Sequence, residues 1–281
     1  MTARSITRRR ILVITVKIVS SVAAFIGIFF LAWILFEVIK RGFQSLNPAF
    51  FTRLPTPPGV EGGGIANAII GTSIMIFLAT ITGVPTGIFA GVYLAEFGQY
   101  TRLGSFIRFS VNIMMGIPSI IVGLFVYTLL VLPFGNFSGY AGAVSLAIIM
   151  IPVTARTAED MLNLVPSSLR ESALALGAPR WRVTLGIVFR AAKTGLITGT
   201  LLAIARVSGE TAPLLFTALN SPYWPSSLTH STPNLTVTIF NYAMSPYQNW
   251  QQIAWGASLL IMTAVLFLTV IARFIFKGPQ K

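Results

Sequence analysis

Long uncharged stretches divide this 281-residue chain. They cover residues 18–36, 62–95, 109–155 and 212–272. A transmembrane helix needs about 20 mostly apolar residues, so the first two stretches can hold one span each and the third can hold two. Turn-forming residues at 133–139 divide the third stretch, and the fourth also divides. The pattern predicts six spans, at 11–36, 65–95, 106–132, 140–158, 194–219 and 253–275.

Composition supports a membrane protein, because 54% of the residues are hydrophobic and only 10% are charged. An ordinary soluble domain is roughly 25% charged. The expected fold class is therefore an all-α polytopic membrane protein embedded in the lipid bilayer. The chain has no Cys and a single His, His230, which excludes a disulfide framework, a thiolate metal site and a His-rich metal site. We expect no metal site.

The basic residues indicate how the chain crosses the membrane. If the N-terminus is cytoplasmic, 15 of the 20 Lys and Arg residues fall in cytoplasmic segments and three, Lys40, Arg41 and Arg53, fall in outer segments. The other two, Lys17 and Arg206, lie within spans. The positive-inside rule then predicts that both termini are cytoplasmic. The same bias accounts for the basic pI, so the charge does not require nucleic-acid binding.

Residues 7–12 are typical of a twin-arginine export signal, and a basic segment before an apolar run is typical of a secretory signal peptide. The apolar run that follows is longer than the roughly 7–15 residues of a signal peptide, and five more spans follow it. We therefore interpret it as an uncleaved first span.

Small residues and prolines recur within the predicted spans. Glycines spaced by four residues would let neighbouring helices approach closely, and the prolines predict kinks. The residues are Gly83, Gly87, Gly91, Gly195, Gly199, Pro85, Pro118, Pro152 and Pro213.

The predicted cytoplasmic loop, 159–193, holds a helix-turn-helix pattern. Ser168 and Glu171 have capping-box spacing, Gly177 suits the C-terminal cap, and Pro179 suits the start of a second helix. Ala173 would keep the first helix slender enough to enter a groove on another protein. An ordinary capped surface helix is equally consistent with this local pattern.

Glu171-Ser172-Ala173, Gly177 and Ile187 resemble the E-A-A…G…I-x-L-P loop of binding-protein-dependent ABC transporter permeases, although Phe189-Arg190 replace Leu-Pro. Segments 206–218, 233–235, 243–246 and 250–255 resemble a permease subunit of bacterial phosphate importers, and the resemblance extends from residue 65 to the C-terminus.

The resemblance implies a type I ABC importer permease fold in the bacterial inner membrane, and a transport subunit that forms half of a phosphate translocation path. The implied partners are a sister permease, two ATPase subunits and an extracytoplasmic phosphate-binding protein, and Glu171, Ala173 and Gly177 would lie at the ATPase interface. The implied organisation is an N-terminal region 1–64, a permease core 65–276 and a tail 277–281. The uncharged loop at 220–252 is a candidate surface for the binding protein.

The chain has no G-x-x-x-x-G-K-[ST] phosphate-binding loop. ATP would therefore be hydrolysed by a partner subunit. We expect no catalytic residues and no bound cofactor in this chain.

Arg206 and Glu210 are the charges of the fifth predicted span, and a spacing of four would place them on one helix face. A charge at the centre of a membrane helix costs about 2.5–3.5 kcal/mol on insertion scales and commonly marks a substrate path. A self-neutralising pair, or a pair bonded to another subunit, is the structural alternative. Arg206 could bind phosphate oxygens, Glu210 could orient Arg206 or accept a hydrogen bond from protonated phosphate, and Ser208 and Thr211 could add hydroxyl donors.

Two other functions are weighed against this prediction. A permease of the same type could carry another oxyanion, such as sulfate or molybdate. A self-contained secondary transporter is less favoured, because the sequence shows neither repeated halves nor enough acidic residues for proton coupling.

Overall fold

The computed structural model describes residues 3–60 and 62–274, and these residues form helices joined by loops. The elements are α1 (Ala3–Phe43), α2 (Pro48–Thr52), α3 (Ala66–Val92), η1 (Tyr93–Phe97), α4 (Arg102–Gly116), α5 (Ser119–Val126), η2 (Tyr127–Val131), α6 (Leu132–Phe134), α7 (Gly139–Asn163), α8 (Ser167–Ala175), α9 (Arg180–Val183), η3 (Thr184–Val188), α10 (Phe189–Val207), α11 (Ala212–Thr217), α12 (Leu235–Ala243) and α13 (Gln248–Phe274). The η elements are π-helical turns.

Five helical stretches are long and apolar enough to cross a membrane. They are Arg9–Phe43, Ala66–Phe97, Gly139–Asn163, Arg180–Val207 and Gln248–Phe274. Helix α4 and the helical segment Ser119–Phe134 pass the same test only together, and they meet at an angle of 104°, as in a broken sixth crossing or a re-entrant segment. The predicted helical membrane fold is confirmed. The tail 277–281 and the last residue of the predicted sixth span lie outside the described residues.

The third predicted span, 106–132, is broken at Pro118, where the proline predicted a kink, rather than continuous. Ile117 has extended backbone angles (φ −73°, ψ 127°), and Pro118 precedes the first residue of α5. A residue before proline disfavours the helical region, and proline has no N–H to continue the helical hydrogen bonds. These two effects end α4 and turn the chain into α5.

The fifth predicted span, 194–219, is wrong. The helix begins earlier, at Arg180, and ends at Val207, and residues 208–211 separate it from α11. Pro213 in the first turn of α11 could not donate to the carbonyl four residues earlier, and its ring would clash with that carbonyl. An uninterrupted helix through this segment is therefore unfavourable.

The predicted outer loop, 220–252, contains a helix that the sequence reading missed. Residues 235–243 form α12, in which Leu235, Val237 and Tyr242 are buried. Asn234 caps this helix, since its side-chain oxygen accepts from the Val237 N–H at 2.9 Å. The loop is consequently part of the packed bundle rather than wholly a surface connection.

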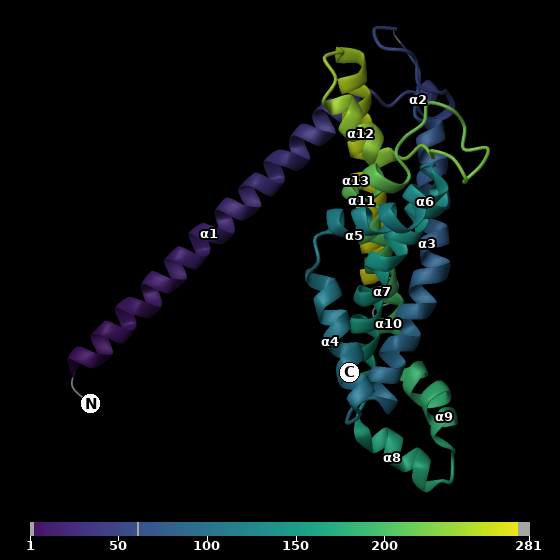
Figure 1. The fold of residues 1–281 in the computed structure, drawn as a ribbon. Helices are drawn as coiled ribbons and strands as arrows, with labels where there is room; N and C mark the ends of the chain where they lie inside the picture. The colour runs from purple at the N-terminus through teal and green to yellow at the C-terminus, as the bar shows by residue number, and fades with distance from the viewer. Residues whose placement is uncertain (1–2, 61, 275–281) are drawn as a thin grey trace.

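Glycines bring α3 and α10 close to α7, as the spacing predicted. A Cβ atom added to Gly87 would lie 2.7 Å from Thr154 Cβ, and one added to Gly91 would collide with Ala155 and Ala158. Gly199 of α10 packs in the same way on Thr157. Of the five stretches, the one formed by α7 is the most buried, and it lies at the centre of the bundle (Figure 1).

Helix α1 stands apart from the bundle and extends away from it diagonally (Figure 1). Only its C-terminal end packs, where the Arg41 guanidinium lies 5.1 Å from the centre of the Trp255 ring and Gly42 contacts Leu259 of α13. The remaining apolar side chains of α1, such as Phe25 and Trp33, are exposed. An apolar helix of this length requires lipid or another chain around it.

Candidate functional site

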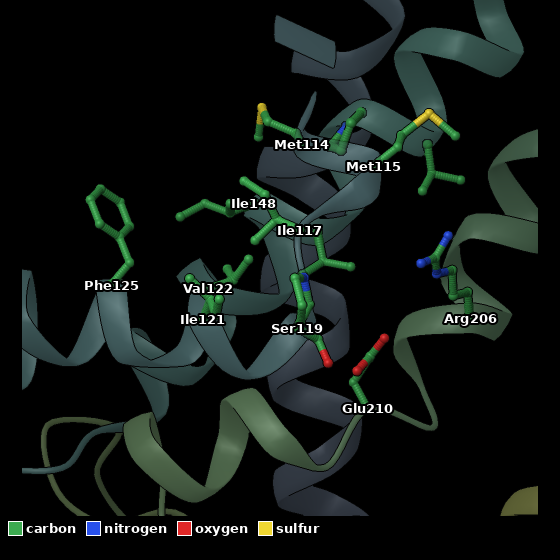
Figure 2. A pocket seen from close by; sticks show the side chains of 14 residues that line it. Met114, Met115, Ile117, Ser119, Ile121, Val122, Phe125, Ile148, Arg206 and Glu210 are labelled. Atoms are coloured by element: carbon green, nitrogen blue, oxygen red, sulfur yellow. The ribbon is translucent and has the colours of Figure 1, made fainter. Parts of the chain in front are cut away.

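Two helix breaks enclose a cavity of about 450 Å³, one between α4 and α5 and the other between α10 and α11 (Figure 2). Its walls are mostly apolar, and its charged residues are Arg206 and Glu210. The lining residues are Met114, Met115, Ile117, Pro118, Ser119, Ile121, Val122, Phe125, Ile148, Ile149, Pro152, Val153, Arg206 and Glu210. Irregular backbone is tolerated at membrane depth where it lines such a cavity.

Arg206 and Glu210 line this one cavity, but they do not share a helix face as predicted. Arg206 lies in the last turn of α10, whereas Glu210 follows the end of that helix. Among the described residues, neither side chain forms an ion pair. The structure therefore does not support the alternative of a self-neutralising pair within this chain.

The main chain of Glu210 is held by the rest of the bundle. The Thr236 hydroxyl of α12 donates to the Glu210 carbonyl at 2.9 Å, and the Glu210 N–H donates to the Val207 carbonyl at 3.2 Å. Because both hydrogen bonds use the backbone, the carboxylate stays available to the cavity, into which it points in Figure 2.

Ser208 and Thr211 do not join this pair. The Ser208 hydroxyl donates to the Ile204 carbonyl at 2.7 Å, and Ser208 lines a separate, largely apolar cavity beside Thr72 and Leu235. Thr211 precedes α11 without a side-chain capping bond and is not among the lining residues of the first cavity. The predicted group of four is therefore divided, and only Arg206 and Glu210 lie together.

Ser119 also lines the cavity, although the sequence did not predict it as a site residue. It is the first residue of α5 and points toward the same space as Glu210 (Figure 2). The preceding Pro118 offers no side-chain cap to the helix. The α5 N-terminus, with its partial positive charge, therefore lies at the cavity that Arg206 also lines. The Pro118-Ser119 sequence could have indicated this helix start.

The cavity holds one cationic and one anionic side chain, so its charges suit an anion that binds Arg206 and can donate a hydrogen bond to the Glu210 carboxylate. The Arg206 guanidinium offers a fork of donors, and the α5 N-terminus adds a weaker positive field. Surrounding side chains such as Met114 and Phe125 are apolar, and charge interactions are stronger in such a low-dielectric environment than in water.

The helix-turn-helix at 166–183 forms largely as predicted. Helix α8 begins at Ser167 after Pro166 and has no side-chain N-cap bond, so the predicted capping box is wrong. Gly177 has φ +80°, and its N–H donates to the Leu174 carbonyl at 2.9 Å while the Ala178 N–H donates to the Ala173 carbonyl at 3.2 Å. These paired bonds form a Schellman motif, which confirms Gly177 as the stop of the helix.

The two residues of α8 that were assigned to an ATPase interface face different directions. Glu171 is exposed, whereas Ala173 is buried against Leu162 and Val183 of its own chain. Ala173 is small because it packs inward, and not because the outer face must be slender. Leu169 and Leu176 are exposed instead and give this end of the bundle an apolar surface.

Comparison with known proteins places these features in a family. Residues 83–278 match the family described as "Binding-protein-dependent transport system inner membrane component". The chain belongs to this family. It is a multi-pass membrane permease of an ABC importer, and the family works with an ATPase and a binding protein.

Named relatives indicate which members of the family this chain is similar to in sequence. The chain is 49% identical over 259 residues to a protein of Yersinia pestis named "Phosphate transport system permease protein PstA", covering 92% of this chain and 88% of the relative. A Pasteurella multocida protein of the same name is 47% identical, covering 93% and 92%. A Methanocaldococcus jannaschii protein named a probable PstA is 35% identical, covering 88% of each chain.

Two solved structures share the fold of this chain, and their low sequence identity supports no comparison beyond the fold. A chain of the inward-facing MetNI methionine ABC transporter matches with a TM-score of 0.65 at 20% identity, covering 76% of this chain and 94% of that one. A chain of a bacterial ABC transporter that imports alginate matches with a TM-score of 0.57 at 15% identity, covering 77% and 80%.

Proposed function

We propose that this permease carries phosphate across the bacterial inner membrane and forms half of the translocation path, the other half coming from a sister permease. The observation that carries the proposal is the cavity between the two helix breaks, which is lined by Arg206 and by Ser119 at the N-terminus of α5. Among the described residues, Arg206 has no ion-pair partner. The names of the relatives from Yersinia pestis and Pasteurella multocida support phosphate as the anion.

In this proposal Arg206 and Glu210 act on the substrate together. The guanidinium binds two phosphate oxygens, since its fork of donors matches their spacing. The Glu210 carboxylate accepts a hydrogen bond from a protonated phosphate oxygen, which fully ionised sulfate lacks. Ser119 can add a hydroxyl donor or acceptor from the opposite wall.

The proposed partners follow from the two ends of the bundle. Helix α8 and the residue after it present Glu171, Leu169 and Leu176 to one of two ATPase subunits, which hydrolyse the ATP that drives transport. With both termini cytoplasmic, as the basic residues predict, the segment before α12 faces a phosphate-binding protein outside. Tyr223 and Trp224 are exposed there.

The test is uptake of radiolabelled phosphate in cells that lack this gene, carrying the wild-type chain or Arg206→Gln. We expect the wild-type chain to restore high-affinity uptake that neither sulfate nor molybdate competes, and Arg206→Gln to restore only about a hundredth of it. If phosphate uptake is unchanged by the deletion while sulfate or molybdate uptake is lost, the architecture stands and the phosphate proposal is wrong.

A further inference from the structure

A partly buried ion pair ties helix α8 to η1, the turn that follows α3. Arg170 of α8 donates to Glu96 Oε1 from Nη2 at 2.8 Å and from Nε at 3.1 Å. The two side chains are only 21% and 10% exposed. Solvent therefore screens this pair far less than an ordinary surface ion pair.

Arg170 also holds the segment that leads into α8. Its guanidinium donates to the Leu162 carbonyl at 2.7 Å and to the Val165 carbonyl at 2.5 Å. One side chain thus binds the end of α7, the linker after it and the carboxylate at the end of α3. Such multiple charge-assisted bonds fix a geometry more firmly than a single contact.

Glu96 lies in η1, the π-helical turn that follows α3. A second arginine holds the same turn from the other side, because Arg108 of α4 donates to the Leu94 carbonyl at 3.4 Å. Arg108 also donates to the buried Glu159 of α7 at 2.8 Å. The turn is therefore held between α8 and α4.

Helix α4 continues from Arg108 to the cavity. Met114 and Met115, near its other end, line the space that holds Arg206. Helix α8 lies at the end of the bundle below α4 (Figure 1), so a short series of contacts connects α8 with the cavity wall. A regular helix between these points passes on a displacement of one end to the other.

We infer that Glu96 and Arg170 are positioning residues that make α8 and α4 move as one unit, so that movement of the ATPase subunits changes the shape of the anion cavity. This inference rests on the proposed function. It assigns these residues neither to the substrate nor to the ATPase surface, since their side chains are bonded to each other and to their own chain.

The experiment uses the whole complex, with its sister permease and ATPase subunits, reconstituted in lipid vesicles with the binding protein. Phosphate import and ATP hydrolysis are measured together in Glu96→Gln, which keeps the shape of the side chain and removes its charge. We expect the number of ATP molecules used per phosphate imported to rise about threefold or more. Glu96→Asp, which keeps the charge, should recover most of the wild-type ratio.

Asp160→Asn is the matched control. Asp160 pairs with Arg156 at 3.2 Å at the same end of the bundle, but both residues lie on α7, so their bond joins no two elements. The ratio of ATP to phosphate should stay at the wild-type value in this variant. An unchanged ratio in Glu96→Gln, including a parallel loss of both activities, would overturn the inference.

Hydrogen exchange of residues 166–176 in the intact complex separates the two proposals. Glu96→Gln should speed exchange in α8, whereas Asp160→Asn should not. If the wild-type complex imports no phosphate, the proposed function fails, but the effect on exchange still tests the positioning of α8. If exchange in α8 is the same in wild type and Glu96→Gln, the positioning role is wrong.

Discussion

Two regions of the molecule use the same residue types in opposite ways. Around η1, Arg170 is bonded to Glu96 and Arg108 to Glu159, each pair joining different elements. Around the break between α10 and α11, Arg206 and Glu210 line a cavity without forming ion pairs within the described chain. Paired charges that join helices stabilise and position them, whereas charges left unpaired in an apolar cavity are available to a ligand.

Arg206→Gln should show most clearly that the cavity charges serve transport and the paired charges serve stability. We expect import to fall about a hundredfold, because a charge-assisted bond to the anion is lost. Thermal stability of the purified complex should change little, since Arg206 forms no ion pair in the described chain. Radiolabelled uptake and a melting curve on the same preparation measure both. A large drop in melting temperature would place Arg206 with the structural charges instead.

Glu159→Leu should have the opposite effect, because it should lower stability more than import. It leaves Arg108 and Arg156 without their shared carboxylate. We expect a loss of about 2 kcal/mol in stability, below the roughly 3–5 kcal/mol of a fully buried pair because both arginines are partly exposed. Denaturant or thermal unfolding in detergent measures this. Wild-type stability would contradict the structural role of the pair.

Glu210→Gln should alter selectivity more than rate. We expect phosphate uptake to persist, and sulfate to compete about threefold better or more, because the acceptor that favours a protonated anion is weakened. Competition curves with the two anions measure the ratio. Unchanged rejection of sulfate would show that Glu210 does not select the substrate.

Ser208→Ala should have the smallest effect. The hydroxyl donates to a carbonyl of its own helix and does not reach the anion cavity, so uptake should stay within about twofold of wild type. Ser119→Ala is the informative companion, since Ser119 lies in that cavity. A stronger effect at Ser208 than at Ser119 would mean that the anion follows the other cavity.

Sequence patterns predicted the parts of the fold that depend on composition and spacing. Apolar length gave the membrane crossings, and the glycines of α3 pack on α7 as their spacing predicted. Hydropathy could not reveal the breaks at Pro118 and at 208–211, because an apolar segment has the same mean hydropathy whether its helix is straight or broken. The sharp turn at Pro118 depends on backbone sterics that a window average ignores.

The candidate site was predicted only in part. Arg206 and Glu210 were found because a charge in an apolar span is costly, and that argument does not depend on helix geometry. Ser208 and Arg206 line different cavities, and this does depend on geometry, since it follows from the helix end at Val207. The bond between Arg170 and Glu96 joins residues far apart in the sequence, and no local pattern predicts it.

The break at 208–211 also bears on how the subunit is made in the cell. Hydrocarbon offers no hydrogen-bond partner to the backbone groups freed at a helix end, so a face with such a break cannot be left against lipid tails. Part of the backbone here is bonded within the chain, but Gly209 is exposed. A newly inserted copy would therefore need another chain, such as the proposed sister permease, to cover this point. If so, the amount of this protein should follow the synthesis of that chain, with surplus copies degraded.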